Sequence, residues 1–314
     1  MTSEQSGSAA AARDPFGTAG RRKQGAARLS VFSNTALTSF KLVTFVVTGS
    51  VSILSEALHS GLDLVAAVMA YAAVRKSRYP ADADHQFGHG KFESLSGVAE
   101  GALIMVAVVM IGWSAFDRLL THHPAVAHPG LGVIVMGISA VVNVFVSRML
   151  FRVSRATDSI ALEADAWHLR TDVWTSVGVL VGMAAIAVAR LAGVHVLDIL
   201  DPLIALGVAV VIAKAAWDIM ARSWDHLVDR SLPAEEVSMI EGLLRKHYPD
   251  LVGYHRLRTR KAGSQRYIDL HLLVSGDESV ADAHFLCDHL ENELKSMLPE
   301  AEVLIHVEPK GSDD

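Results

Sequence analysis

The chain has 314 residues, of which 51% are hydrophobic and 20% are charged, with a formal net charge of −6 and a single cysteine. These averages combine two parts of different composition. Residues 1–232 contain 37 charged residues (16%) and carry a net charge of +1, whereas residues 233–314 contain 25 (30%) and carry −7. The acidic balance argues against a nucleic-acid partner, because nucleic acids select basic surfaces. One cysteine excludes a disulfide framework and a cysteine-based zinc cluster.

The first part contains six apolar stretches, each close to the 20 residues that span a bilayer. Polar residues seldom recur at helical spacing within them, so the helices of a soluble bundle would have almost no polar face to turn toward water. We therefore predict a membrane α-helical domain over residues 29–232, with six transmembrane helices. The expected spans are Val31–Thr48, Ser52–Val74, Ser94–Phe116, Leu131–Leu150, Ile160–Val188 and Pro202–Met220.

The charges outside the spans predict the orientation. Residues 1–28 contain five lysines and arginines but no apolar core of a signal peptide, so we expect a disordered cytoplasmic arm there. The connections after the second and fourth spans are also basic, whereas those after the first, third and fifth contain no lysine or arginine. The positive-inside rule then places both termini in the cytoplasm. Lys41 lies inside the first span, and we expect its side chain to snorkel toward the outer interface.

Two His-x-x-x-Asp motifs lie inside predicted spans, where ionisable groups are costly and indicate function. The second span carries His59 and Asp63, and the fifth carries His168 and Asp172. A spacing of four residues puts each pair on one helix face. Two such faces turned toward each other would offer two imidazole nitrogens and two carboxylate oxygens, which suits a tetrahedral divalent cation, zinc first. The alternative is a pair of hydrogen bonds that only hold the spans together.

These motifs, the segment Pro80–Ser94 and the order of six spans before an acidic tail resemble the cation diffusion facilitator family. The resemblance is greatest to its bacterial zinc and iron efflux branch and covers about residues 29–309. It implies that a homodimer exports a divalent metal ion from the cytoplasm by proton antiport and alternating access, with the two motifs as the transport site. It also implies a zinc preference, because His59 stands where exporters of broader range carry Asp. Cadmium, manganese, cobalt and iron remain alternatives.

The connection after the second span contains Asp82, His85 and His89 within eight residues. On its own this cluster is ambiguous. The resemblance implies a secondary metal site in this loop, with Asp84 as an alternative to Asp82. It also implies a bridge between Lys91 and Asp229 that ties the membrane part to the tail and to the dimer partner.

The hydrophobic pattern changes at Pro233 and predicts an α+β domain over residues 233–309, followed by a short tail at 310–314. An α-β-β-α-β order of this kind forms a small open sheet with helices on one face. The resemblance implies a cytoplasmic domain with a metallochaperone-like fold. The expected elements are a helix at Ala234–Tyr248, strands at Tyr254–Lys261 and Arg266–Val274 joined by a turn, a helix at Val280–Met297 and a strand at Glu302–Val307.

Several histidines of the tail are candidate metal ligands. His306 and Glu308 are two residues apart on a strand and therefore share a face. The resemblance implies metal binding between protomers at His255, His271, His284 and His306, with Glu308 where the family has Asp. Each histidine taken alone is more often an ordinary surface or core residue. We expect cytosolic metal to neutralise the acidic tail and to draw two tails together, which favours transport.

Two other classes of protein are alternatives to a transporter. A membrane metalloenzyme needs an open zinc position and a general base, and the sequence contains no His-Glu-x-x-His motif. A membrane metal sensor would bind the ion in the spans without moving it and would use the tail as its reporter. The closed set of four ligands favours a secondary active transporter that binds zinc, protons and the lipid bilayer, and not an enzyme.

Overall fold

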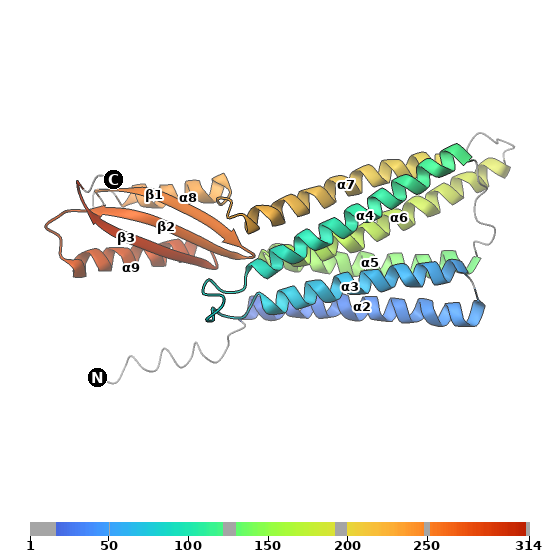
Figure 1. The fold of residues 1–314 in the computed structure, drawn as a ribbon, viewed down its shortest axis with the longest axis horizontal. Coiled ribbons are helices and arrows are strands. Elements are labelled where there is room, and N and C mark those ends of the chain that lie inside the picture. The colour runs from blue at the N-terminus through green and yellow to red at the C-terminus, as the bar shows by residue number, and fades with distance from the viewer. Residues whose placement is uncertain (1–16, 50, 122–129, 192–199, 248–251, 312–314) are drawn as a thin grey trace. The chain divides into compact units, whose positions relative to one another are not determined.

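The computed structural model describes residues 17–49, 51–121, 130–191, 200–247 and 252–311. The chain forms two compact units, Met1–Ser223 and Trp224–Asp314. The first unit is helical, and the second combines helices with a sheet (Figure 1). The boundary lies near the change in charge density of the sequence, because the apolar helices and the charged tail bury different kinds of surface.

Six long helices follow the six predicted spans (Figure 1). They are α2 (Thr18–Thr48), α3 (Val51–Lys76), α4 (Lys91–Thr121), α5 (Gly130–Thr157), α6 (Ile160–Leu191) and α7 (Leu200–Leu227). Each has 26 to 32 residues, so each exceeds the roughly 30 Å hydrocarbon thickness of a bilayer at 1.5 Å per residue. Among the described residues, α2 to α5 contain stretches long and apolar enough to cross a membrane.

The outer surface of these helices is apolar. Phe32, Trp113, Phe145 and Val210 each expose more than half of their surface. Polar side chains such as Glu100, by contrast, are buried between the helices. This reversal of the usual distribution is stable in hydrocarbon and not in water, which agrees with a multi-pass membrane domain.

Small residues let the helices of this unit approach closely. Gly97 and Gly101 face α7 from α4, and a Cβ atom built at Gly101 would lie 3.2 Å from the carbonyl oxygen of Ala216. Such glycine pairs four residues apart are typical of packed membrane helices, where close backbone approach supplies the attraction. The helix α6, which carries one His-x-x-x-Asp motif, packs against α3, α4 and α5.

A buried carboxylate joins four segments at one end of the first unit. Glu93 of α4 accepts a hydrogen bond from Lys23 Nζ of α2 at 3.1 Å and from Ser77 Oγ at 3.0 Å. It also accepts a hydrogen bond from Ser159 Oγ, directly before α6. Glu93 and Lys23 are both buried, and such a charge is stable in an apolar interior only when its oxygens are paired.

This network corrects the prediction of a disordered arm over residues 1–28. Helix α2 begins at Thr18, so residues 18–28 are helical. Lys23 is held by Glu93, and Ala26 and Ala27 are buried against Leu150 and Leu162. The basic composition suggested a solvated arm, but in the structure its single lysine is an internal counter-ion. Residues 1–16 lie outside the described residues.

The second unit is a three-stranded sheet with two helices on one face. It contains α8 (Ala234–Lys246), β1 (Gly253–Ala262), β2 (Gln265–Val274), α9 (Val280–Met297) and β3 (Ala301–Pro309), in the predicted α-β-β-α-β order. The strand order is β1-β2-β3, with β1 antiparallel and β3 parallel to β2. A two-residue turn, Gly263-Ser264, joins β1 to β2, and Gly263 has the positive φ of +62° that favours glycine there.

Alternation along the strands separates a core face from an open face. On β2, Ile268, Leu270 and Leu272 are buried, and they pack against Leu244 of α8 and Leu290 of α9. Successive side chains of a strand point to opposite faces. The residues between these three therefore face away from the helices, and His271 is one of them.

The buried pair predicts how the start of α2 is stabilised. Replacement of Lys23 by alanine (Lys23→Ala) removes a hydrogen bond to a charged group, a type of interaction that contributes about 1.5–3 kcal/mol. We expect amide hydrogen exchange across residues 18–28 to become about tenfold faster or more, as measured by mass spectrometry on the full chain in nanodiscs. Arg22→Ala, which removes an exposed charge one residue away, is the matched control and should leave the rates unchanged. Equal rates in both variants would contradict this role of Lys23.

Candidate functional site

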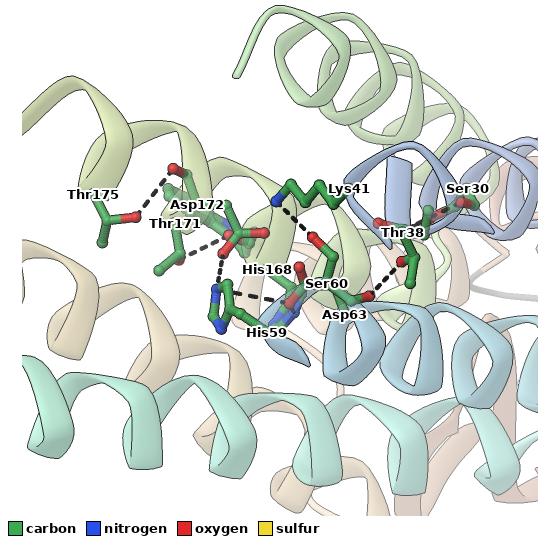
Figure 2. A network of polar contacts seen from close by, with 12 residues as sticks. Ser30, Thr38, Lys41, His59, Ser60, Asp63, His168, Thr171, Asp172 and Thr175 are labelled. Carbon is green, nitrogen blue, oxygen red and sulfur yellow. Dashed lines mark hydrogen bonds and ion pairs between the residues drawn. The ribbon is translucent and has the colours of Figure 1, made fainter. Parts of the chain in front are cut away.

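The four residues of the two His-x-x-x-Asp motifs come together between α3 and α6. His59 and Asp63 project from α3, and His168 and Asp172 project from α6 (Figure 2). Each pair is at least two helical turns from both ends of its helix. The sequence spacing put each pair on one face, and the packing of α3 on α6 turns the two faces toward each other.

Three of the four side chains, His59, Asp63 and Asp172, are close enough to share one cation, and His168 contacts Asp63. His168 Nε2 lies 3.1 Å from Asp63 Oδ1, and His59 Nε2 lies 3.6 Å from Asp172 Oδ1 and 3.9 Å from Asp63 Oδ1. One ligand atom each from His59, Asp63 and Asp172 falls within 4.8 Å of the others. Such separations leave room for a cation whose bonds to nitrogen and oxygen are about 2.0–2.2 Å long.

Two buried polar atoms of this cluster have no hydrogen-bond partner among the described residues, namely His168 Nδ1 and Asp172 Oδ2. Asp63 and His168 are buried, whereas the His59 side chain is 49% exposed. The cluster therefore combines an enclosed side with one ligand that the surroundings can reach. Unpaired acceptors and two carboxylates in an apolar bundle suit a divalent cation, which would neutralise them.

Lys41 does not snorkel outward, contrary to the prediction from its sequence position. It is 4% exposed, its Nζ donates a hydrogen bond to Ser60 Oγ at 2.7 Å, and it forms an ion pair with Glu56 at 3.2 Å (Figure 2). Ser60 is the residue after His59, and its carbonyl oxygen accepts a hydrogen bond from Thr38 Oγ1 at 3.0 Å. A lysine can remain inside the bundle here because a carboxylate and a hydroxyl group face it. These contacts hold α2 to α3 beside the site.

The sequence reasoning left out two acidic groups that the structure buries. Glu100 of α4 and Asp165 of α6 have no measurable exposed surface. Ser96 Oγ donates a hydrogen bond to Glu100 at 2.9 Å. Asp165 lies three residues before His168, so the two share a helix face. Their position inside a predicted span was a signal for both, but neither belongs to a repeated motif.

The loop between α3 and α4 brings Asp82 to both histidines. Asp82 Oδ1 lies 3.3 Å from His85 Nδ1, and Asp82 Oδ2 lies 3.3 Å from His89 Nε2. His89 is buried, and its Nδ1 lies 3.2 Å from the carbonyl oxygen of Tyr79. Asp84 takes a different role, because its backbone N–H donates to Asp82 Oδ1 at 3.1 Å. The backbone N–H of His85 also donates to this oxygen, and this bond is the main cause of the lowered pKa of Asp82.

The strand register of the second unit places three histidines in one row. His255 of β1 pairs with His271 of β2, and His271 pairs with His306 of β3. Neighbouring imidazoles are 5.1 Å and 4.9 Å apart between ring centroids. Because residues in register across adjacent strands point to the same face, all three lie on the open face of the sheet.

Glu308 completes this row. Its carboxylate lies 2.8 Å from His255 Nε2, 2.7 Å from His271 Nδ1 and 3.5 Å from His306 Nε2. His284 lies on α9, where its Nε2 is 3.8 Å from Asp288, and it is outside this cluster. The structure therefore brings together four of the five predicted ligands of the tail. The strand alternation predicted only the closeness of His306 and Glu308.

A second group of possible ligands in the tail was not predicted. His247, at the end of α8, lies 3.0 Å from Glu293 of α9, and His289 lies 3.4 Å from the same carboxylate. His289 and Glu293 are four residues apart on one helix, but His247 is distant in sequence. Only the packing of α8 on α9 reveals this group.

The predicted bridge between Lys91 and Asp229 remains a prediction. Lys91 is the first residue of α4, and Asp229 follows α7. Within the second unit, Arg260 Nη1 donates a hydrogen bond to Asp229 Oδ1 at 3.3 Å. Asp229 also has a positive φ of 56°, which Asp tolerates better than most residues.

Comparison with known families identifies the family of the chain. Residues 27–228 match the model of the cation efflux transmembrane domain, and residues 232–310 match the model of the cation efflux protein cytoplasmic domain. The chain therefore belongs to the cation efflux family, the cation diffusion facilitators that its motifs resemble. Its members are transporters and not enzymes, so this chain is a cation efflux transporter with a multi-pass membrane domain.

Individual relatives cover most of the chain. An uncharacterized transporter of Synechocystis sp. is 38% identical over 281 residues, which is 90% of this chain and 88% of the relative. The cation-efflux pump FieF of Shewanella oneidensis is 33% identical over 284 residues, covering 90% and 93%. A solved structure of the metal-bound C-terminal domain of the CzcD transporter from Thermotoga maritima is 32% identical, with a TM-score of 0.24, and covers 26% of this chain and 100% of that domain.

The hydrogen bonds to Glu308 predict its titration in zinc-free protein. Donation from His255, and then from His271, favours the ionised carboxylate and holds the pKa of Glu308 below the usual value of about 4.3. The stabilisation is present above that usual value and is lost as the pH falls through the lowered pKa. We expect carbon-13 NMR of labelled Glu to show that His255→Ala raises this pKa, whereas His284→Ala leaves it unchanged. A pKa that ignores His255→Ala would contradict the bonding.

Proposed function

We propose that this chain exports Zn²⁺ from the cytoplasm in exchange for protons. The observation that supports this most directly is the meeting of His59, Asp63, His168 and Asp172 between α3 and α6. Two imidazoles and two carboxylates are a complete tetrahedral ligand set, which favours carrying an ion over catalysis at an open position. The proposal goes beyond membership of the family, which by itself defines a cation efflux transporter.

The chemistry of the donors supports zinc as the substrate. Imidazole nitrogen is a borderline ligand that suits Zn²⁺, whereas Mg²⁺ and Ca²⁺ prefer sites made of oxygen alone. The two carboxylates would neutralise the charge of a divalent ion in the apolar bundle. Manganese, cobalt, iron and cadmium differ from zinc by smaller preferences, so competition between metals must decide among them.

Proton exchange follows from the same ligands. Metal binding needs neutral imidazoles and ionised carboxylates, so bound protons and a bound metal ion exclude each other. His59 and His168 both lie against carboxylates, where release of the metal leaves acceptors that protons can fill. In this cycle the site binds a metal ion when it is open to the cytoplasm and binds protons when it is open to the other side. The change between the two states moves the metal ion out and the protons in.

The distribution of basic residues supports the direction of transport. Arg75 and Lys76 end α3, and Arg155 lies in the last turn of α5. These two helix ends and the start of α2 share the basic side, which the positive-inside rule assigns to the cytoplasm. Both termini would then be cytoplasmic, and the acidic C-terminal unit would meet the metal before its export.

The transport site predicts the effect of removing one ligand. In proteoliposomes with a pH gradient, we expect Asp172→Ala to reduce the initial rate of zinc uptake at least about a hundredfold, because a buried charged ligand is lost. Asp218→Ala, which removes an exposed carboxylate of α7, is the matched control and should transport normally.

Three results of this experiment would contradict the proposal. The first is zinc uptake by Asp172→Ala at the wild-type rate. The second is wild-type protein that binds zinc but moves none, as a membrane sensor would. The third is stronger inhibition of uptake by manganese or iron than by unlabelled zinc, which would overturn the choice of metal.

We further propose that the second unit responds to cytosolic zinc in a homodimer. Glu308, His255 and His271 form a half-buried ligand group on the open face of the sheet, and the exposed His306 lies 3.5 Å from Glu308. The residues fit a zinc ion, which prefers such nitrogen and carboxylate ligands. Zinc would offset part of the tail's net charge of −7, which otherwise keeps two copies apart. The loop group of Asp82, His85 and His89 offers a further site of the same chemistry.

The response of the tail can be measured between two copies of the full chain. A spin label at Glu278→Cys in a Cys287→Ser background should show a shorter distance between copies after zinc is added. We expect His271→Ala to lose this change, and His289→Ala, outside the row, to keep it. The change should also persist in Asp172→Ala, because that ligand belongs to the membrane domain. A distance that ignores saturating zinc would contradict the proposed response.

A further inference from the structure

Four arginines gather around one cavity between α5 and α6, apart from every ligand group above. Arg148, Arg152 and Arg155 are spaced four and three residues apart and therefore share one face of α5. Arg170 comes from α6. The cavity has a volume of about 970 Å³. Such a concentration of positive charge at one end of a membrane helix needs a negative partner or contact with water.

Aromatic side chains line the same cavity. Phe151 and Trp167 meet edge to face at 5.3 Å between ring centroids, and Trp167 and Trp174 do so at 6.1 Å. The guanidinium groups of Arg155 and Arg170 each lie 5.8 Å from the Phe151 ring. These cation–π contacts hold two of the positive groups over an apolar wall. The cavity therefore has a charged part and an apolar part.

No carboxylate neutralises these arginines within the described part of the chain. Several other described arginines are paired with carboxylates, as Arg222 is with Glu163 at 2.7 Å and Arg266 is with Glu236 at 2.8 Å. Four like charges around one cavity repel each other, and an ion pair with an acidic side chain would have relieved that repulsion. Arg148, Arg152 and Arg155 are exposed, so an anion from the surroundings can reach them and relieve the repulsion.

We propose that this cavity binds the headgroup of an anionic phospholipid. Guanidinium groups bind phosphate oxygens in pairs of hydrogen bonds, and tryptophans favour the interface between headgroups and acyl chains. The neighbouring surface of α5 is apolar, with Val141 and Phe145 exposed, so acyl chains can continue along it. A free phosphate ion would leave the aromatic wall uncovered, whereas a phospholipid covers both parts.

The bound lipid would act on the helix that carries half of the transport site. Arg170 lies between His168 and Asp172 along α6, and the other three arginines lie on α5. One headgroup held from both helices would link α5 to α6 at the membrane surface. The lipid composition of the membrane would therefore influence the position of α6 relative to α5.

Native mass spectrometry of the full chain from nanodiscs tests this site. The probes are phosphatidylglycerol and phosphatidylcholine with identical acyl chains. We expect wild type to retain phosphatidylglycerol selectively. Arg152→Gln/Arg155→Gln should lower that selectivity about 100-fold, because each substitution removes charge-assisted hydrogen bonds to the phosphate that contribute about tenfold. Arg22→Gln/Arg75→Gln removes two exposed arginines at the same end of the bundle and should lower it at most about threefold, because diffuse attraction alone is lost.

Four results would overturn the assignment. Wild type that retains both lipids equally has no selective headgroup site. Equal losses in the two double variants would show that only diffuse surface charge attracts the lipid. Displacement of the lipid by millimolar inorganic phosphate would identify a free-anion site. Protection of the four arginines from a guanidinium-modifying reagent in discs of phosphatidylcholine alone would show that protein covers the cavity. Arg148→Gln, a single exposed change, provides a second variant with an expected loss of about tenfold.

Discussion

An ionised carboxylate can stay inside an apolar helical bundle only where cations or hydrogen-bond donors face it. This requirement decides how the helices of the membrane domain meet. Asp63 of α3 lies against His168 of α6, and Asp172 of α6 lies against His59 of α3. Toward one end of the bundle, Glu93 collects Lys23 and two serine hydroxyls from three other segments. A shift of any of these helices would leave a buried charge without its partner.

The same constraint explains why the proposed transport site is open to exchange. At Glu93, lysine and serine donors satisfy both oxygens, so the group serves the fold. In the site, one nitrogen of His168 and one oxygen of Asp172 have no partner among the described residues, and His59 is half exposed. A metal ion or protons can satisfy these atoms in turn. A buried charged group whose hydrogen bonds all come from the protein has a structural role. A buried group with an unpaired atom can instead bind a metal ion or a proton.

The C-terminal unit gathers ligands by another route. In the membrane domain, helical spacing pairs the residues of one motif, and helix packing then joins two motifs. In the sheet, strand pairing alone aligns His255, His271 and His306, which lie far apart in the sequence. Glu308 follows two residues later on the same face and reaches all three. The core of the unit occupies the other face of the sheet, so a metal ion bound by these residues would not disturb the hydrophobic packing.

The sequence by itself determined the elements and the local pairs. The length of the apolar stretches predicted the helices, and the hydrophobic pattern of the tail predicted the order of its helices and strands. The spacing of four residues placed His59 with Asp63 and His168 with Asp172. All of these features depend on near neighbours along the chain. Only the tertiary structure decided that Lys23 and Lys41 are internal counter-ions, that Asp82 and not Asp84 meets the loop histidines, and that Glu308 joins three strands. Those outcomes depend on which side chains, distant in sequence, are packed together in the folded protein. Composition and local spacing do not indicate these contacts.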